Sequence, residues 1–215
     1  ISGGTDITAT VDNNTVSFTA ASNFNGSENF TATVTDGEFS ASQAFSVTVA
    51  PVNDAPTANA ASGTVAEDGS VVITLTGNDI DGDIITFSVA DSAVNGSVSI
   101  GGSLAIYTPS ANFSGDDSFT FTASDGDLSD TATVTLTVTA VNDAPTLASV
   151  DAVSFDEDGS GATTLVGSDV DAGDTLEYSI SGGTEITATL DGDTVSFTAS
   201  QDFNGSETFT ATVTD

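Results

Sequence analysis

The segment Thr131-Ala132-Thr133-Val134-Thr135-Leu136-Thr137-Val138-Thr139 alternates hydroxyl and apolar side chains. Successive side chains of a strand point to opposite faces of a sheet, so Val134, Leu136 and Val138 share one apolar face. Residues 118–124 alternate in the same way. This pattern predicts antiparallel sheets that are packed on one side only.

Further strands are predicted on both sides of this segment, with Gly and Asp clusters between them. Counting the two segments above, about seven strands fall within about 90 residues: 63–66, 71–76, 84–90, 97–100, 103–108, 118–124 and 131–139. No stretch shows a sustained helical period. The fold class is therefore predicted as all-β, with seven-stranded, Greek-key, immunoglobulin-like sandwiches. Tyr107 and Phe113 are expected to fill the core rather than to bind a ligand.

The chain is built from internal repeats. Val52-Asn53-Asp54-Ala55-Pro56-Thr57 returns unchanged at 141–146, 89 residues later, and the segment 1–10 returns almost unchanged at 180–189. A spacing of 89 residues is the length of one small β domain. We therefore predict half of a repeat, one complete repeat and most of a third, with these bounds: 1–51, 52–140 and 141–215. The chain is expected to be a window from a longer protein.

Composition excludes several classes of function. The 215 residues include no Lys, Arg, His, Cys, Met or Trp, and the formal net charge is −32. Binding to nucleic acid or to an anionic membrane needs basic side chains. Without Cys and His there is no thiolate nucleophile, no zinc–thiolate site and no Ser/His pair. The 38% hydrophobic content argues against a disordered polyelectrolyte.

So much negative charge on a folded chain needs cations from outside. The loop Asp79-Ile80-Asp81-Gly82-Asp83 and its counterpart with Asp169, Asp171 and Asp174 place several carboxylates around a Gly-containing turn. Hard divalent ions prefer such oxygen ligands, and Ca²⁺ fits best. High salt, or an acidic coat that serves only solubility, are the alternatives.

An EF-hand does not fit these loops, because Ala90 and Ile180 stand where its twelfth-position Glu would be. The remaining ligands must come from elsewhere in the fold. Asn53 and Asp54 lie at the junction between two repeats, and the loop at Asp125 is expected to reach the same end of the sandwich. Oxygens from two repeats and their linker would then converge on one ion.

The chain resembles tandem cadherin repeats over nearly its whole length. The resemblance rests on 65–70 (Val-Ala-Glu-Asp-Gly-Ser), 77–83 (Gly-Asn-Asp-Ile-Asp-Gly-Asp), 86–89 (Thr-Phe-Ser-Val), 123–126 (Ala-Ser-Asp-Gly) and the run from 134 into 141–145. It is most similar to the cadherin-like repeats of very large bacterial surface and biofilm proteins. The resemblance implies a set of Ca²⁺ ligands, namely Asn53, Asp54, Glu67, Asp79, Asp81, Asp125, Asn142, Asp143, Asp169, Asp171 and Asp215.

The linker departs from the cadherin pattern Asp-x-Asn-Asp-Asn. Pro51 and Ala140 stand in place of its first Asp, and Ala55 and Ala144 in place of its last Asn. We therefore expect one or two ions at each junction rather than three.

The expected function is structural: a calcium-rigidified extender or stalk of a secreted or surface-anchored bacterial adhesin or matrix protein. Its expected partners are Ca²⁺ and neighbouring repeats, without membrane insertion. One alternative is a self-assembling subunit of an extracellular filament, in which copies pair through strand edges. A carbohydrate-binding module is less favoured, since the chain has no Trp and only two Tyr. No enzyme is expected: glycoside hydrolysis could use carboxylates alone, but these acids recur at the ends of every repeat.

Overall fold

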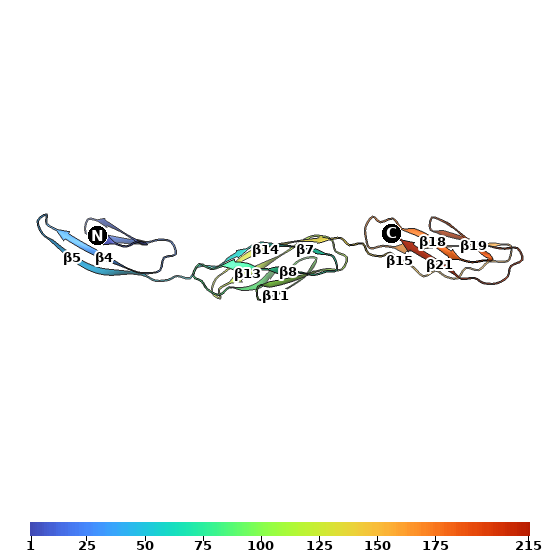
Figure 1. Cartoon of the computed structure of the whole chain (residues 1–215), viewed down its shortest axis with the longest axis horizontal. Coiled ribbons are helices and arrows are strands. Elements are labelled where there is room, and N and C mark those ends of the chain that lie inside the picture. The colour runs from blue at the N-terminus through green and yellow to red at the C-terminus, as the bar shows by residue number, and fades with distance from the viewer. The chain divides into compact units, whose positions relative to one another are not determined.

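The computed structural model describes residues 1–215 and contains strands but no helix (Figure 1). It confirms the prediction of an all-β chain of immunoglobulin-like sandwiches. Because there is no helix, no helical segment could cross a membrane.

The chain divides into two compact units. Unit 1 comprises Ile1–Gly63, Val71–Thr108 and Asp116–Leu136, and unit 2 comprises Thr64–Ser70, Pro109–Gly115 and Thr137–Asp215. This division cuts across the middle repeat. The repeat boundaries after residues 51 and 140 therefore stay a prediction.

The first repeat forms two small sheets, β1-β4-β5 and β2-β3. Its strands are β1 (Ser2–Gly3), β2 (Ile7–Asp12), β3 (Thr15–Ala20), β4 (Gly26–Thr35) and β5 (Ser40–Val49). β4 and β5 pair antiparallel over ten positions and lie side by side in Figure 1. Phe18, Phe30 and Phe45 pack together between the sheets, with ring centroids 5.0–6.2 Å apart.

The middle repeat has a four-stranded sheet, β10-β13-β14-β7, and a three-stranded sheet, β11-β12-β8, which together confirm the seven predicted strands. A short extra sheet pairs β6 with β9. The strands are β6 (Thr57–Asn59), β7 (Ala61–Ala66), β8 (Val71–Thr74), β9 (Thr76–Asn78), β10 (Thr86–Asp91), β11 (Gly96–Gly101), β12 (Leu104–Pro109), β13 (Gly115–Ser124) and β14 (Ser129–Thr139).

Two predicted strands were wrong in detail. The strand predicted at 71–76 is interrupted at Leu75, whose N–H donates to the Ser103 carbonyl at 2.8 Å. There the chain leaves the β8–β12 pair and joins β6, which the sequence did not reveal. The strand predicted from residue 84 begins at Thr86, because its partner β13 ends at Ser124, which lies opposite Thr86; Ile84 is left 85% exposed.

Alternation along β13 and β14 buries the predicted apolar face. Phe119, Phe121, Val134 and Leu136 are all buried. Tyr107 is also fully buried, as predicted, and its hydroxyl donates to Asp117 at 2.9 Å. Burial raises the pKa of the Tyr107 hydroxyl. Phe113 is only half-buried, so it closes the edge of the core rather than filling it.

The third repeat consists of three sheets, β15-β17, β16-β20-β19 and β18-β21. The core of this repeat is formed by Leu165, Val195 and Phe197. Its strands are β15 (Thr146–Leu147), β16 (Ser160–Thr164), β17 (Gly167–Ser168), β18 (Glu177–Gly182), β19 (Ile186–Asp191), β20 (Thr194–Ala199) and β21 (Phe209–Thr214).

A glutamate closes the same loop in the first and third repeats. Glu28 accepts the backbone N–H groups of residues 5–7 at 2.8–3.1 Å, and Glu207 accepts those of residues 184–186 at 2.8–3.2 Å. Hydrogen bonds to the ionised form of a carboxylate lower its pKa. The Thr184 hydroxyl, together with these N–H groups, lowers the pKa of Glu207 from 4.5 to about 2.

Replacing Phe121 by Ala is expected to lower the free energy of unfolding by about 3–5 kcal/mol, because a fully buried ring is lost and a cavity remains. Urea unfolding followed by circular dichroism measures the change. Val72, which is 58% exposed, provides the control: Val72→Ala should change stability by no more than about 0.5 kcal/mol. Equal losses in the two variants would contradict the assigned core.

Because hydrogen bonds lower the pKa of Glu207, we expect the fold to lose stability in acid. A carboxylate with a lowered folded pKa stabilises the fold above its unfolded pKa, and this contribution disappears as the pH falls through the folded value. For Glu207 the loss should run from pH 4.5 down to about 2. Glu207→Gln should therefore unfold at a lower temperature than the wild type near neutral pH, and its unfolding temperature should fall less on acidification.

The exposed Glu157 provides a matched control, since Glu157→Gln should keep the wild-type pH dependence. A wild-type pH dependence in Glu207→Gln would show that the loop does not depend on this carboxylate.

Candidate metal sites at the repeat junctions

Each acidic loop uses one carboxylate oxygen to shape its own backbone. Asp79 Oδ1 accepts the N–H groups of Asp81 at 2.8 Å and Asp83 at 3.3 Å. Asp169 Oδ1 accepts the N–H of Asp171 at 2.9 Å. The second oxygens, Asp79 Oδ2 and Asp169 Oδ2, are buried and have no hydrogen-bond partner. In both loops, therefore, a buried carboxylate oxygen is left free to bind a ligand.

The first junction (residues 51–56) contacts two loops of the middle repeat within unit 1. The N–H of Asp54 donates to Asp81 Oδ2 at 2.8 Å, and the side-chain amide of Asn53 donates to Asp125 Oδ2 at 2.9 Å. The backbone N–H of Leu128, followed by the Asn53 amide, lowers the pKa of Asp125. Residues 72 positions apart in sequence thus meet at this junction.

A cavity of about 390 Å³ lies at the first junction. Asp54 and Asp79 line it, together with Asn23 and Asn78. Since a water molecule occupies about 30 Å³ in the liquid, this space can hold an ion with part of its hydration shell. The cavity therefore brings oxygen atoms from the linker and from the acidic loop to one place.

The second junction (residues 140–145) repeats these contacts within unit 2. The N–H of Asp143 donates to Asp171 Oδ2 at 2.6 Å, and the Asn142 amide donates to Asp215 Oδ2 at 2.6 Å. Asp171 and Asp215 correspond in the repeat to Asp81 and Asp125. The same arrangement therefore forms twice, once in each unit.

Glu67 adds a buried carboxylate to the second junction. Its side chain is only 5% exposed, and Oε1 accepts the N–H of Val141 at 2.6 Å. The backbone N–H of Glu67 also donates to the carbonyl of Thr139 at the end of β14, at 2.9 Å. Burial of an ionised carboxylate is costly unless it is paired or binds a cation. No Lys, Arg or His exists in the chain to serve as its partner.

Carboxylates crowd together at this second junction. Asp169, Asp171 and Asp174 each bring an oxygen to within 4.8 Å of the others. Asp143 Oδ2 is buried and has no hydrogen-bond partner. Burial and then the charge of Asp171, with smaller contributions from neighbouring acids, raise the pKa of Asp143. Neutralising one of these carboxylates should therefore reduce the electrostatic repulsion at the second junction.

The structure assembles most of the candidate ligands that the sequence suggested. Asp83 differs from these residues. Within its loop it makes contact through its backbone N–H, and it is exposed. Sequence reasoning missed Asp68, whose charge acts on Asp143, and Asn23, which lines the first cavity. Both residues adopt a left-handed backbone conformation, with φ of 61° and 60°. Their signal in the sequence was recurrence at the same repeat position, as Asp158 and Asn112.

The ligand set is chemically uniform. It consists of carboxylate, amide and backbone oxygens, with no sulfur and no imidazole nitrogen available in the chain. Hard divalent cations prefer such oxygens, and Ca²⁺ accepts six to eight of them in flexible geometry. The buried, unpaired oxygens of Asp79, Asp143 and Asp169 therefore fit a cation of this kind.

A family model described as a bacterial Ig domain matches residues 53–137 and again 142–215. No curated protein matches the chain. Among solved structures, extracellular cadherin domains 1–4 of protocadherin gamma B7 match over 99% of this chain and 64% of their own, at 16% identity and a TM-score of 0.57. This chain therefore spans about two thirds of that structure's length.

Two other cadherins are similar in structure. Extracellular domains 1–2 of human protocadherin-24 match over 75% of this chain and 95% of their own, at 17% identity and a TM-score of 0.51. Domains 1–4 of Drosophila N-cadherin match over 91% and 59%, at 15% identity and a TM-score of 0.50. Likeness at these identities shows the fold, and it confirms the predicted cadherin-like tandem repeats.

Replacing Asp143 by Asn is expected to have opposite effects with and without Ca²⁺. In chelator, the variant should unfold at a higher temperature, because a buried charge repelled by Asp171 and its neighbours is removed. With Ca²⁺ added, it should gain less stability than the wild type, because one candidate ligand has lost its charge. Differential scanning calorimetry measures both changes.

Asp191→Asn provides a charge-matched control on the exposed surface of β19 and should respond to Ca²⁺ like the wild type. A lower unfolding temperature of Asp143→Asn in chelator would contradict the repulsion inferred at this junction.

Proposed function

Because this chain belongs to the bacterial Ig domain family, we propose that it is an extender segment of a secreted or surface-anchored bacterial protein, stiffened by Ca²⁺ at the junctions between repeats. Tandem immunoglobulin-like repeats with cadherin-like folds support an adhesin-like spacer role. Its work would be mechanical, namely to hold an adhesive or matrix-forming part at a distance from the cell.

One observation carries the ion-binding part of this proposal. Buried carboxylate oxygens without partners occur at both junctions, at Asp79 in the first and at Asp143 and Asp169 in the second. A buried acceptor without a partner loses its hydration without compensation, and the cost is larger when the group is charged. A chain without Lys, Arg or His has no cationic side chain to pair with these oxygens.

The proposed ligands come from the linker and from the following repeat at both junctions, and at the second junction also from Glu67 of the preceding repeat. At the first junction they are Asn53, Asp54, Asp79, Asp81 and Asp125, with Asp83 at the rim. At the second they are Glu67, Asn142, Asp143, Asp169, Asp171, Asp174 and Asp215. A bound Ca²⁺ ion would supply the positive charge that these oxygens lack.

Rigidity would follow from where these residues are attached. Glu67 directly follows β7 of the middle repeat, Asp143 belongs to the linker, and Asp171 belongs to the third repeat. Without a cation their charges repel, which favours separation of the two repeats. When the charges are neutralised, the three segments can share one site and the junction should lose its freedom to bend.

A location outside the cell suits this chemistry. Extracellular Ca²⁺-binding modules work at dissociation constants of roughly 10⁻⁴–10⁻³ M, which matches sites that are partly exposed and shared between repeats. Bacterial Ig domains are typical of surface and extracellular proteins, which supports the same placement. Recurrence of the acidic site at each junction favours a structural role over catalysis.

Small-angle X-ray scattering of the chain with Ca²⁺ and with chelator tests the proposal. The maximum dimension should be larger and the flexibility smaller with Ca²⁺, because neutralised junctions stop bending. NaCl at matched ionic strength controls for simple screening. The double variant Asp81→Asn, Asp171→Asn should behave in Ca²⁺ as the wild type does in chelator. An unchanged maximum dimension on chelation would rule out calcium stiffening.

A further inference from the structure

One sheet of the middle repeat, β11-β12-β8, carries apolar side chains on its outer face. Val72 of β8 is 58% exposed, and Leu104 and Ile106 of β12 are 47% and 45% exposed. In the antiparallel β8–β12 pair, Val72 lies directly opposite Ile106. Residues two apart on a strand share a face, and cross-strand pairs lie close together. Val72, Leu104 and Ile106 therefore form one continuous surface, which we call the outer patch.

The outer patch is not part of the core of the sandwich. The residues that alternate with it along β8 and β12, namely Ile73, Ala105 and Tyr107, are buried. The outer patch therefore points to the opposite side of the sheet, toward solvent. The middle repeat fills its core without these three side chains.

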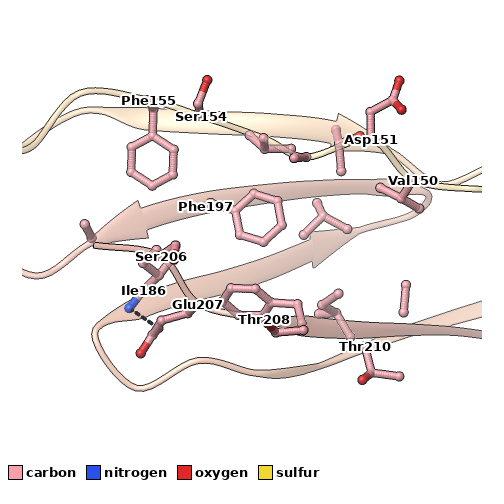
Figure 2. A pocket seen from close by; sticks show the side chains of 18 of the residues that line it. Val150, Asp151, Ser154, Phe155, Ile186, Phe197, Ser206, Glu207, Thr208 and Thr210 are labelled. Carbon is pink, nitrogen blue, oxygen red and sulfur yellow. Dashed lines mark hydrogen bonds between the residues drawn. The ribbon is translucent and has the colours of Figure 1, made fainter. Parts of the chain in front are cut away.

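The third repeat has the corresponding strand pair, but its outer face lacks large apolar side chains. β20 pairs with β16 as β12 pairs with β8. Figure 2 shows Phe197 of β20 pointing inward, across from Phe155. At the places of the outer patch, the third repeat has small or hydroxyl side chains: Ala162, Thr194 and Ser196. The inner faces of the two strand pairs are therefore alike, and the outer faces differ.

The first repeat agrees with the third. On β3, which corresponds to β12, Thr15 and Ser17 take the places of Leu104 and Ile106, and both are exposed. Two repeats thus fold with hydroxyl side chains at these positions. Packing within a repeat does not require apolar residues there, so the outer patch needs an explanation outside its own sandwich.

The outer patch belongs to the longest part of the chain without an acid. Residues 92–115, which include β11 and β12, contain no Asp or Glu, although the chain carries 32 acids. β8 contains none either. The exposed residues of β11 that alternate with its half-buried ones include Ser97 and Ser99. The outer face of this sheet is therefore uncharged.

Charge favours the same face of a second copy as the occupant. Two copies repel each other wherever acidic surfaces meet, since each carries a net charge of −32 and has no Lys or Arg to offset it. Close approach costs least where neither copy brings a carboxylate, and the outer face of this sheet meets that condition. A charged partner would find no opposite charge there. An apolar patch also matches an identical patch, as a two-fold contact requires.

We propose that the outer face of sheet β11-β12-β8 packs against the same face of a second copy of this chain, around a two-fold axis. Sheets that pack face to face interdigitate their side chains at a separation of about 10 Å. The outer patch would then be buried between the two copies. This goes beyond the extender role and does not need Ca²⁺.

The size of the face sets the strength of the contact. Strands of about six residues, spaced about 4.8 Å apart, give a three-stranded face of roughly 300 Å². A typical stable complex buries about 800 Å² on each partner. Two free chains should therefore associate weakly, and the contact becomes effective where many copies are held close together.

Analytical ultracentrifugation of the whole chain in chelator, up to millimolar concentration, tests for the dimer. The wild type should shift from monomer to dimer, and more strongly as NaCl is raised, because salt screens the repulsion between acidic copies. The triple variant Val72→Ala, Leu104→Thr, Ile106→Ser gives the middle repeat the outer residues of the third. It should raise the dissociation constant at least about tenfold, because the apolar contact is lost.

The matched control removes three exposed apolar side chains from other surfaces. Val34, Ile84 and Val166 are at least as exposed as the outer patch, so the variant Val34→Ala, Ile84→Ser, Val166→Thr should associate like the wild type. A wild type that stays monomeric, or a triple variant of the outer patch that associates as tightly as the wild type, would overturn the proposal. The use of chelator keeps this result separate from calcium stiffening, so either proposal can fail alone.

A dilution series of the ¹⁵N-labelled wild type, followed by two-dimensional NMR, locates the contact without any substitution. Amide signals of β8, β11 and β12 should shift with protein concentration. Signals of the corresponding strands β16 and β20 should stay constant, because their outer face lacks the apolar patch. Shifts confined to other strands would contradict the proposed face. Constant signals throughout would rule out a second copy and leave an uncharged partner of another kind as the occupant.

Discussion

Carboxylates in this chain have no basic side chain to pair with, and the arrangement of its loops follows from that constraint. Backbone N–H groups take the place of cations. Glu28 and Glu207 each accept three consecutive N–H groups, and Asp79 shapes its loop in the same way. A carboxylate that accepts several such bonds is held ionised at low pH, as the lowered pKa of Glu207 indicates. Folding thus places a set of acids where the backbone alone can satisfy them.

At the junctions, backbone N–H groups do not satisfy every carboxylate oxygen. Asp143 and Asp169 have oxygens that no N–H group reaches, and Glu67 is buried with one backbone partner. Asp79 and Asp169 combine both situations. One carboxylate oxygen closes a loop within a repeat, and the other lies buried at a junction without a partner. The proposed cation site therefore lies at the junctions between repeats, where the buried oxygens without partners are found.

Much of the fold was predictable, because side-chain alternation is a local signal. The alternating residues of β13 and β14 identify their buried faces directly, and Tyr107 lies in the core as expected. The structure departs from the predicted strands where the chain changes from one pairing strand to another. Leu75 ends β8 because the chain moves to β6, a pairing between segments whose three-residue length carries no periodic signal. The candidate site was predictable as a set of acidic loops, but the part played by Asp68 was not.

The sequence by itself determined the strand-rich repeats, the absence of internal cations and the recurrence of acids beside each linker. These properties depend on composition and on spacing along the chain. Only the tertiary structure decided which oxygens share a site, since Asn53 and Asp125 are 72 residues apart, and which of them have no partner. The physical reason is that the surroundings of a buried carboxylate are set by the groups that pack around it, and in the folded chain these groups come from segments that lie far apart in sequence.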